Sequence, residues 1–210
     1  MTVTEYYIPA TPVKYEEIIK KSRFIVSISH AETPENAKAF IKSVRDAYSH
    51  ANHNCFAYMT CPPGHVNGTG MSDDGEPSGT AGKPMLGVLL NSNVGEIAAV
   101  VTRYFGGVKL GTGGLVRAYS GVLKNGLNLL ETTLKIIRIP VFISVSYADI
   151  QTVKHLIDQF GAESENETFS ETVEMLVLVR QGDETSFSNA LQNMTKGRAV
   201  VNFLNQKINK

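Results

Sequence analysis

The sequence predicts an α+β protein made of two domains, and three observations lead to this prediction. Runs rich in β-branched residues alternate with amphipathic helical stretches along the chain, as in mixed α+β folds. Pro140 marks a boundary, after which the elements become short and regular. Glycine is concentrated before that boundary, with 14 of the 18 glycines between positions 64 and 121. We therefore expect a larger domain over residues 1–139 and a smaller one over residues 140–210.

Composition and charge narrow the class of protein. The chain of 210 residues carries no net charge, which argues against a protein that coats nucleic acid by bulk electrostatics. The charge is uneven, however, because residues 97–130 contain four basic side chains and no acidic one. The opening MTVTEYYIPA lacks the features of a signal peptide, and no apolar run approaches the roughly 20 residues that span a bilayer. We expect a cytoplasmic protein with no membrane partner.

The two cysteines are expected to be free thiols. On one strand, Cys55 and Cys61 would lie about 20 Å apart at roughly 3.3 Å per residue, too far for a disulfide. Free thiols agree with a reducing, cytoplasmic location.

Hydrophobic periodicity and capping residues predict the elements of the first domain. Thr33 followed by Pro34 is a good helix start, with Thr33 as N-cap. Residues 62–80 are predicted to be a loop, because turn dipeptides crowd them. The predicted strands cover residues 3–8, 14–20, 23–29, 53–59 and 96–105, and the predicted helices cover 34–48, 81–91 and 113–130.

The second domain has a regular predicted order. A strand over 141–147 is followed by a helix over 149–160 that Asp149 can cap, and a hairpin over 162–179 comes next. A helix over 184–194 and a strand over 199–204 complete it. The order β-α-β-β-α-β is that of the ferredoxin-like unit.

A basic, glycine-rich loop is the first candidate site. It follows the strand 96–105 and opens a helix whose free N–H groups and dipole favour an anion. Aromatic side chains at 104 and 105 can stack on bases beside a phosphate. The alternative is that the glycines only permit a tight turn. The candidate residues for nucleic-acid or phosphate binding are Arg103, Tyr104, Lys109, Gly111, Gly113, Gly114 and Arg117.

An acidic loop is the second candidate site. Asp73, Asp74 and Glu76 supply the oxygen ligands that Mg²⁺ prefers, and paired carboxylates can also transfer protons. The alternative is a structural role in which they pair with Arg103 and Arg117.

Other motifs are weak. The spacing of His50, His53, Cys55 and His65 fits no zinc pattern, and a Cys55–His53 nucleophilic pair has no third group to orient it. Neither a Walker A motif nor a dinucleotide glycine motif is present. We predict no catalytic residue, no metal and no cofactor.

Four motifs are Ser22-Arg23-Phe24, His53 to Tyr58 (HNCFAY), Asp73 to Pro84 (DDGEPSGTAGKP) and Arg103 to Tyr119 (RYFGGVKLGTGGLVRAY). Together they resemble the motifs of the IMPACT family, in its bacterial YigZ branch. The resemblance implies an N-terminal domain with the ribosomal protein S5 domain 2-like fold. It also implies a ferredoxin-like C-terminal domain similar to those that end translocation elongation factors.

The resemblance and the residues together predict a non-enzymatic cytoplasmic protein that binds RNA or the translation apparatus, such as a ribosome or translation factor, in regulation of translation. The alternative is an enzyme for a phosphorylated ligand, in which the glycine loop holds phosphate and Asp73, Asp74 or Glu76 holds Mg²⁺.

Overall fold

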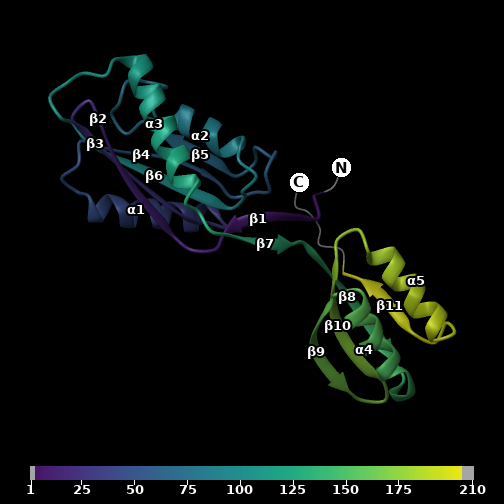
Figure 1. Ribbon diagram of the computed structural model, residues 1–210. Coiled ribbons are helices and arrows are strands. Elements are labelled where there is room, and N and C mark those ends of the chain that lie inside the picture. The colour runs from purple at the N-terminus through teal and green to yellow at the C-terminus, as the bar shows by residue number, and fades with distance from the viewer. Residues whose placement is uncertain (1–2, 205–210) are drawn as a thin grey trace. The chain divides into compact units, whose positions relative to one another are not determined.

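A computed structural model describes residues 3–204, and they form two compact units. One unit comprises residues 6–135; the other comprises residues 136–204 together with residues 3–5. The outermost residues of the predicted domains, 1–2 and 205–210, lie outside the described residues. Both units combine helices and sheets (Figure 1), so the α+β prediction is confirmed.

The first unit is built on a five-stranded antiparallel sheet. Its strands are β2 (Val13–Ile19), β3 (Ser22–His30), β4 (His53–Met59), β5 (Thr69–Ser72) and β6 (Ile97–Tyr104). Their order across the sheet is β2-β3-β6-β4-β5, so β6 lies in the centre between two strands that precede it in the chain. Seven of the eight residues of β6 are buried, as expected for a strand covered on both faces.

Helices cover both faces of this sheet (Figure 1). Helix α1 (Pro34–Ala47) packs on one face, where Ile41 and Val44 contact Val100. Helices α2 (Gly82–Leu90) and α3 (Thr112–Leu127) pack on the other. Their side chains form the main core with Phe24, Val26 and three residues of β6, Ile97, Ala99 and Val101. The apolar residues that define the helical and strand patterns in the sequence are therefore buried in the core, as predicted.

A two-stranded ribbon, β1 (Glu5–Pro9) with β7 (Thr132–Ile136), is tied to this unit by Glu96. The buried Glu96 carboxylate accepts hydrogen bonds from Tyr6 of β1 at 2.6 Å and from Lys135 of β7 at 2.7 Å. His30 Nε2 lies 2.8 Å from the other carboxylate oxygen. These contacts outweigh the effect of burial, so the pKa of Glu96 lies below its ordinary value.

The second unit has a four-stranded antiparallel sheet with the order β11-β8-β10-β9. The strands are β8 (Arg138–Val145), β9 (Glu163–Phe169), β10 (Val173–Arg180) and β11 (Val200–Phe203). A 3₁₀ turn, η1 (Tyr147–Asp149), leads into α4 (Ile150–Gln159), and α5 (Glu184–Met194) precedes the last strand. Alternate residues of β8 and β10 form its core with Leu156 and Phe187.

Three local predictions differ from the structure. Residues 62–80 are not all loop, because β5 pairs with β4 there; its sequence, Thr-Gly-Met-Ser, has too little alternation to be recognised. The strand β7 was also missed. Asp149 occupies the N-cap of α4, but its carboxylate makes no capping bond, because Arg198 and Ser146 bind it instead. Thr33, in contrast, caps α1 as predicted.

Candidate anion-binding groove

A groove of about 360 Å³ lies between the acidic loop that follows β5 and the basic loop that follows β6. The two loops come together because β6 lies beside β4, and β4 pairs with β5. The groove is lined by Glu76, Pro77, Arg103, Phe105, Lys109, Leu110, Gly111, Thr112 and Leu115.

Arg103 is the buried cation of this groove. It is 5% exposed, and its guanidinium lies over the rings of Phe24 and Phe105, 5.4 and 5.5 Å from their centroids. Nη1 donates to Glu76 Oε1 at 2.7 Å and Nη2 donates to Ser22 Oγ at 3.3 Å. Within residues 3–204, Arg103 Nε is the one buried side-chain polar atom that has no hydrogen-bond partner. A buried N–H donor without an acceptor is costly, so this atom is suited to a ligand oxygen.

Glu76 connects the groove to the core. Its Oε1 accepts the bond from Arg103 and a second one, at 2.7 Å, from the Tyr119 hydroxyl of α3. Burial, and then the neighbouring Cys55 and Glu76, raise the pKa of Tyr119, so Tyr119 remains a donor at neutral pH. The charge of Glu76 is therefore compensated inside the protein. The positive charge that remains for a ligand comes from Lys109 and from the start of α3.

The other two acidic side chains hold the acidic loop in place. The Asp73 carboxylate accepts three backbone N–H bonds of 2.7–2.9 Å, from Gly79, Ala81 and Gly82 at the start of α2. Burial acts against ionisation, but the three donors outweigh it and keep the pKa of Asp73 below its ordinary value. Asp74 accepts from Arg45 at 2.7 Å and from the Asn54 N–H at 2.6 Å.

The N-terminus of α3 faces the groove with free donors. Its N-cap, Gly111, has φ +75° and no side chain to cap the helix. The first helical bond runs from the Leu115 N–H to the Gly111 carbonyl at 2.9 Å. The N–H groups of residues 112–114 therefore have no partner among the described residues. A helix of 16 residues with a free N-terminus attracts anions through these donors and its dipole.

A second, smaller hollow of about 200 Å³ adjoins the groove, and Leu110 lines both. Arg117 of α3 and Lys20 line this hollow. Lys20 and Lys21 form the two-residue turn between β2 and β3, since Ile19 pairs with Ser22. Both lysines have positive φ, +45° and +66°, in a turn that usually takes Asn-Gly. An exposed basic pair in such a strained conformation is a candidate functional feature.

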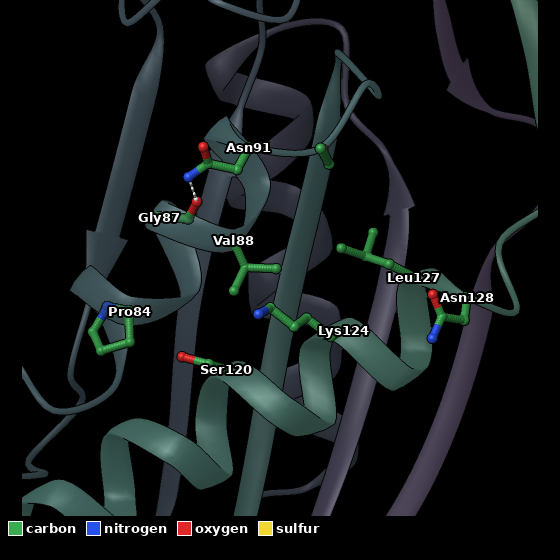
Figure 2. A pocket seen from close by; sticks show the side chains of 9 residues that line it. Pro84, Gly87, Val88, Asn91, Ser120, Lys124, Leu127 and Asn128 are labelled. Atoms are coloured by element: carbon green, nitrogen blue, oxygen red, sulfur yellow. Dashed lines mark hydrogen bonds between the residues drawn. The ribbon is translucent and has the colours of Figure 1, made fainter.

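A larger hollow of about 690 Å³ lies between α2 and α3, and Figure 2 shows Lys124 of α3 extending in it toward Val88 of α2. Asn91 and Asn128 are the C-caps of the two helices and also line it. The carbonyl ends of both helices therefore lie here, and Lys124 compensates their partial negative charge. We attribute this hollow to helix packing.

The structure thus divides the predicted site residues. Arg103, Lys109 and Gly111 line the groove, while Gly114 and Arg117 line the smaller hollow. Tyr104 lines neither of them; its ring packs under the guanidinium of Arg23. Gly113 lies in the first turn of α3. The acidic residues have separate partners: Glu76 pairs with Arg103, as the structural alternative predicts, but Asp74 pairs with Arg45, not Arg117.

Two residues that bind the groove's charged side chains, Ser22 on Arg103 and Tyr119 on Glu76, were not among the predicted site residues. Ser22 and Tyr119 lie inside motifs that the resemblance quotes, but no charge or glycine signal singled them out. Of the two aromatic residues expected to stack on bases, Phe105 lines the groove and Tyr104 does not. The alternation of side chains along a strand offered the signal, because positions 103 and 105 share a face.

The cysteine and membrane predictions can be compared with the structure. Both cysteines are free, as predicted, and Cys55 is fully buried in the core. Burial raises the pKa of the Cys55 thiol to about 12, and its Sγ donates to the Asp73 carbonyl at 2.9 Å. No group of three or more His, Cys, Asp or Glu residues in residues 3–204 is arranged to hold a metal ion. In the same part of the chain, no helix has both the length and the hydropathy needed to cross a membrane.

Comparisons with known proteins agree with the family motifs. Residues 20–127 match the Impact N-terminal domain, and residues 143–198 match a domain of unknown function, DUF1949. An IMPACT family member of Haemophilus influenzae is 39% identical over 202 residues, which are 96% of this chain and 98% of that protein. YigZ of Escherichia coli is 41% identical over 91% of this chain and 94% of its own length. YvyE of Bacillus subtilis is 36% identical over 90% and 86%.

A solved crystal structure, described as that of an hypothetical protein, is similar in fold and in sequence. It is 38% identical, has a TM-score of 0.72, and the match covers 98% of this chain and all of that one. The motifs, the domain matches and the relatives thus agree over nearly the whole length. This chain belongs to the IMPACT family.

Proposed function

We propose that this protein binds RNA through the groove, with one backbone phosphate at the N-terminus of α3. The observation that carries the proposal is Arg103, a buried residue whose Nε has no partner and which lines a groove that also holds a free helix N-terminus and Lys109. A phosphate oxygen satisfies all three kinds of donor at once. The next phosphate along the strand meets Lys20 and Arg117 in the smaller hollow, on the other side of Leu110.

The groove favours this function over Mg²⁺-dependent catalysis on a phosphorylated metabolite. The alternative needs Asp73, Asp74 or Glu76 as metal ligands. Asp73 already accepts three N–H bonds, two of them at the start of α2, Asp74 binds Arg45 and the Asn54 N–H, and Glu76 neutralises Arg103. Turning any of them toward a metal would leave buried donors unsatisfied, at about 1–3 kcal/mol for each donor.

We also propose the finer fold assignments and a role in regulation of translation. The strand order β11-β8-β10-β9 with the element sequence β-α-β-β-α-β supports a ferredoxin-like second unit. For the first unit, the resemblance to the family supports the ribosomal protein S5 domain 2-like fold. Both folds recur in proteins that act on ribosomes, so we propose ribosomal RNA as the natural target and the cytoplasm as the location.

The proposal is tested by fluorescence anisotropy with a labelled single-stranded RNA, titrated between about 50 and 200 mM salt. We expect Lys109→Ala and Arg117→Ala each to weaken binding. Each should also reduce the slope of log affinity against log salt by about 0.7, the value for one contact between a cation and a single-stranded phosphate. Lys124→Ala is the matched control, since it removes the same charge from the same helix as Arg117→Ala, but Lys124 lines neither the groove nor the smaller hollow. It should leave the slope unchanged.

The proposal fails if the wild-type protein binds neither RNA nor purified ribosomal particles in a salt-sensitive manner. The alternative would be favoured by a thermal shift with a nucleotide or phosphorylated metabolite that requires Mg²⁺ and is lost on Asp74→Asn.

A further inference from the structure

We propose that the groove takes one unpaired nucleotide, whose base stacks on Phe105 while its phosphate lies at the N-terminus of α3. This inference rests on the proposed function, because it names the part of an RNA that the groove receives. It adds a requirement for single-stranded structure that phosphate binding by itself does not include.

Phe105 offers a ring face to a ligand. The guanidinium of Arg103 lies 5.5 Å from the ring centroid, so one face of the ring is covered by the protein. The side chain is nevertheless 47% exposed, and it lines the groove. An aromatic ring of this kind, beside a phosphate site, is the usual platform for an unstacked base. Pro77, Leu110 and Leu115 supply the apolar part of the lining.

The backbone holds Phe105 in this position before any ligand binds. Its N–H donates to Asn52 Oδ1 at 2.8 Å, and the next N–H, of Gly106, donates to Ser22 Oγ at 3.3 Å. Gly106 packs so closely on the β2–β3 turn that a Cβ there would lie 1.8 Å from the Lys21 carbonyl oxygen. Because the backbone that carries the ring does not have to be ordered on binding, stacking on the ring costs less conformational entropy.

The size of the groove indicates a single nucleotide. Its volume of about 360 Å³ is near the lower end of the roughly 300–1,000 Å³ found for small-molecule pockets. A duplex keeps its bases stacked inside the helix, where Phe105 cannot reach them, whereas a loop, a bulge or a strand end presents an unstacked base. We therefore expect the groove to discriminate between single-stranded and double-stranded RNA.

The experiment compares three probes of equal length on the full chain. They are a labelled RNA of about 12 nucleotides, within the range that single-strand sites occupy, the same strand annealed to its complement, and an abasic ribose-phosphate oligomer. The wild-type protein should bind the single strand about tenfold more tightly than the abasic oligomer, and the duplex more weakly than the single strand. Phe105→Ala should lower single-strand affinity to the level of the abasic oligomer and leave abasic binding unchanged.

The outcomes separate this inference from the proposed function. If the wild-type protein binds the single strand and the abasic oligomer equally, the base does not stack, although RNA binding through phosphate stands. If it binds neither, both proposals are wrong. Phe105→Leu keeps an apolar side chain without an aromatic face, so it should lose the same discrimination. The wild-type comparison requires no variant to fold.

Discussion

The strained turn between β2 and β3 provides the sharpest test of the proposed phosphate contact in the smaller hollow, which Lys20 and Arg117 line. Lys20 and Lys21 have φ of +45° and +66°, and a left-handed conformation costs a residue with a Cβ about 1–2 kcal/mol. We consider the double variant Lys20→Asn/Lys21→Gly, which places the favoured type I′ pair in the turn. Asparagine tolerates positive φ, and glycine adopts it freely.

The expected gain in stability is the relief of strain minus the entropy of the new glycine. Relief at both positions amounts to about 2–3 kcal/mol. The greater freedom of glycine in the unfolded chain lowers the stability of the folded state by about 0.5–1 kcal/mol. The net gain of about 1–2 kcal/mol should raise the midpoint of thermal unfolding by roughly 5 °C for a protein of this size. Differential scanning calorimetry measures this shift.

The same variant should bind RNA less well, because it removes Lys20, which lines the smaller hollow with Arg117, and the adjoining Lys21. If both lysines meet phosphate, the salt slope falls by about 1.4; if only Lys20 does, it falls by about 0.7. Lys20→Ala/Lys21→Ala is the matched control, which removes the charges and keeps the strain, so it should lose affinity without the gain in stability. A double variant that is no more stable than the wild type would refute the strain argument, and an unchanged salt slope would refute the phosphate contact.

Three further predictions follow from burial and packing. The pKa of Glu96 is lowered in the folded state, so its stabilising effect is present above pH about 4.5 and is lost as the pH falls through the lowered pKa. Urea unfolding should therefore show the stability of wild type and Glu96→Gln converging in acid, and a constant difference would contradict it. Iodoacetamide should modify the half-buried Cys61 well before Cys55, whose pKa is raised to about 12 by burial. Mass spectrometry measures the order of modification, and equal rates for the two cysteines would contradict this prediction. Gly106→Ala should destabilise the protein by about 3 kcal/mol or more. Gly121→Ala in α3, where a Cβ meets no described atom within 4 Å, should stabilise it by about 0.5–1 kcal/mol, and similar effects of the two changes would disprove the close packing.

Only part of the chemistry of the groove could be predicted from the sequence. Glycines ahead of an amphipathic stretch predicted the free start of α3, because helix caps and helix dipoles are local properties. The partner of each charge was not predictable in the same way. Glu76 is 27 residues from Arg103 and 43 from Tyr119, and Asp74 is 29 residues from Arg45. Such pairs form only after the sheet is assembled.

Local sequence determined the helices, most strands, the cap at Thr33 and the free thiols, since periodicity, capping and chain reach act over a few residues. The family motifs determined the family. The tertiary structure decided that Asp73 starts a helix, that Glu76 neutralises Arg103, and that Lys20 lies beside Arg117. The physical reason is the strand order β2-β3-β6-β4-β5. Alternation along a strand specifies which face a side chain takes, but it does not specify which strand becomes the neighbour.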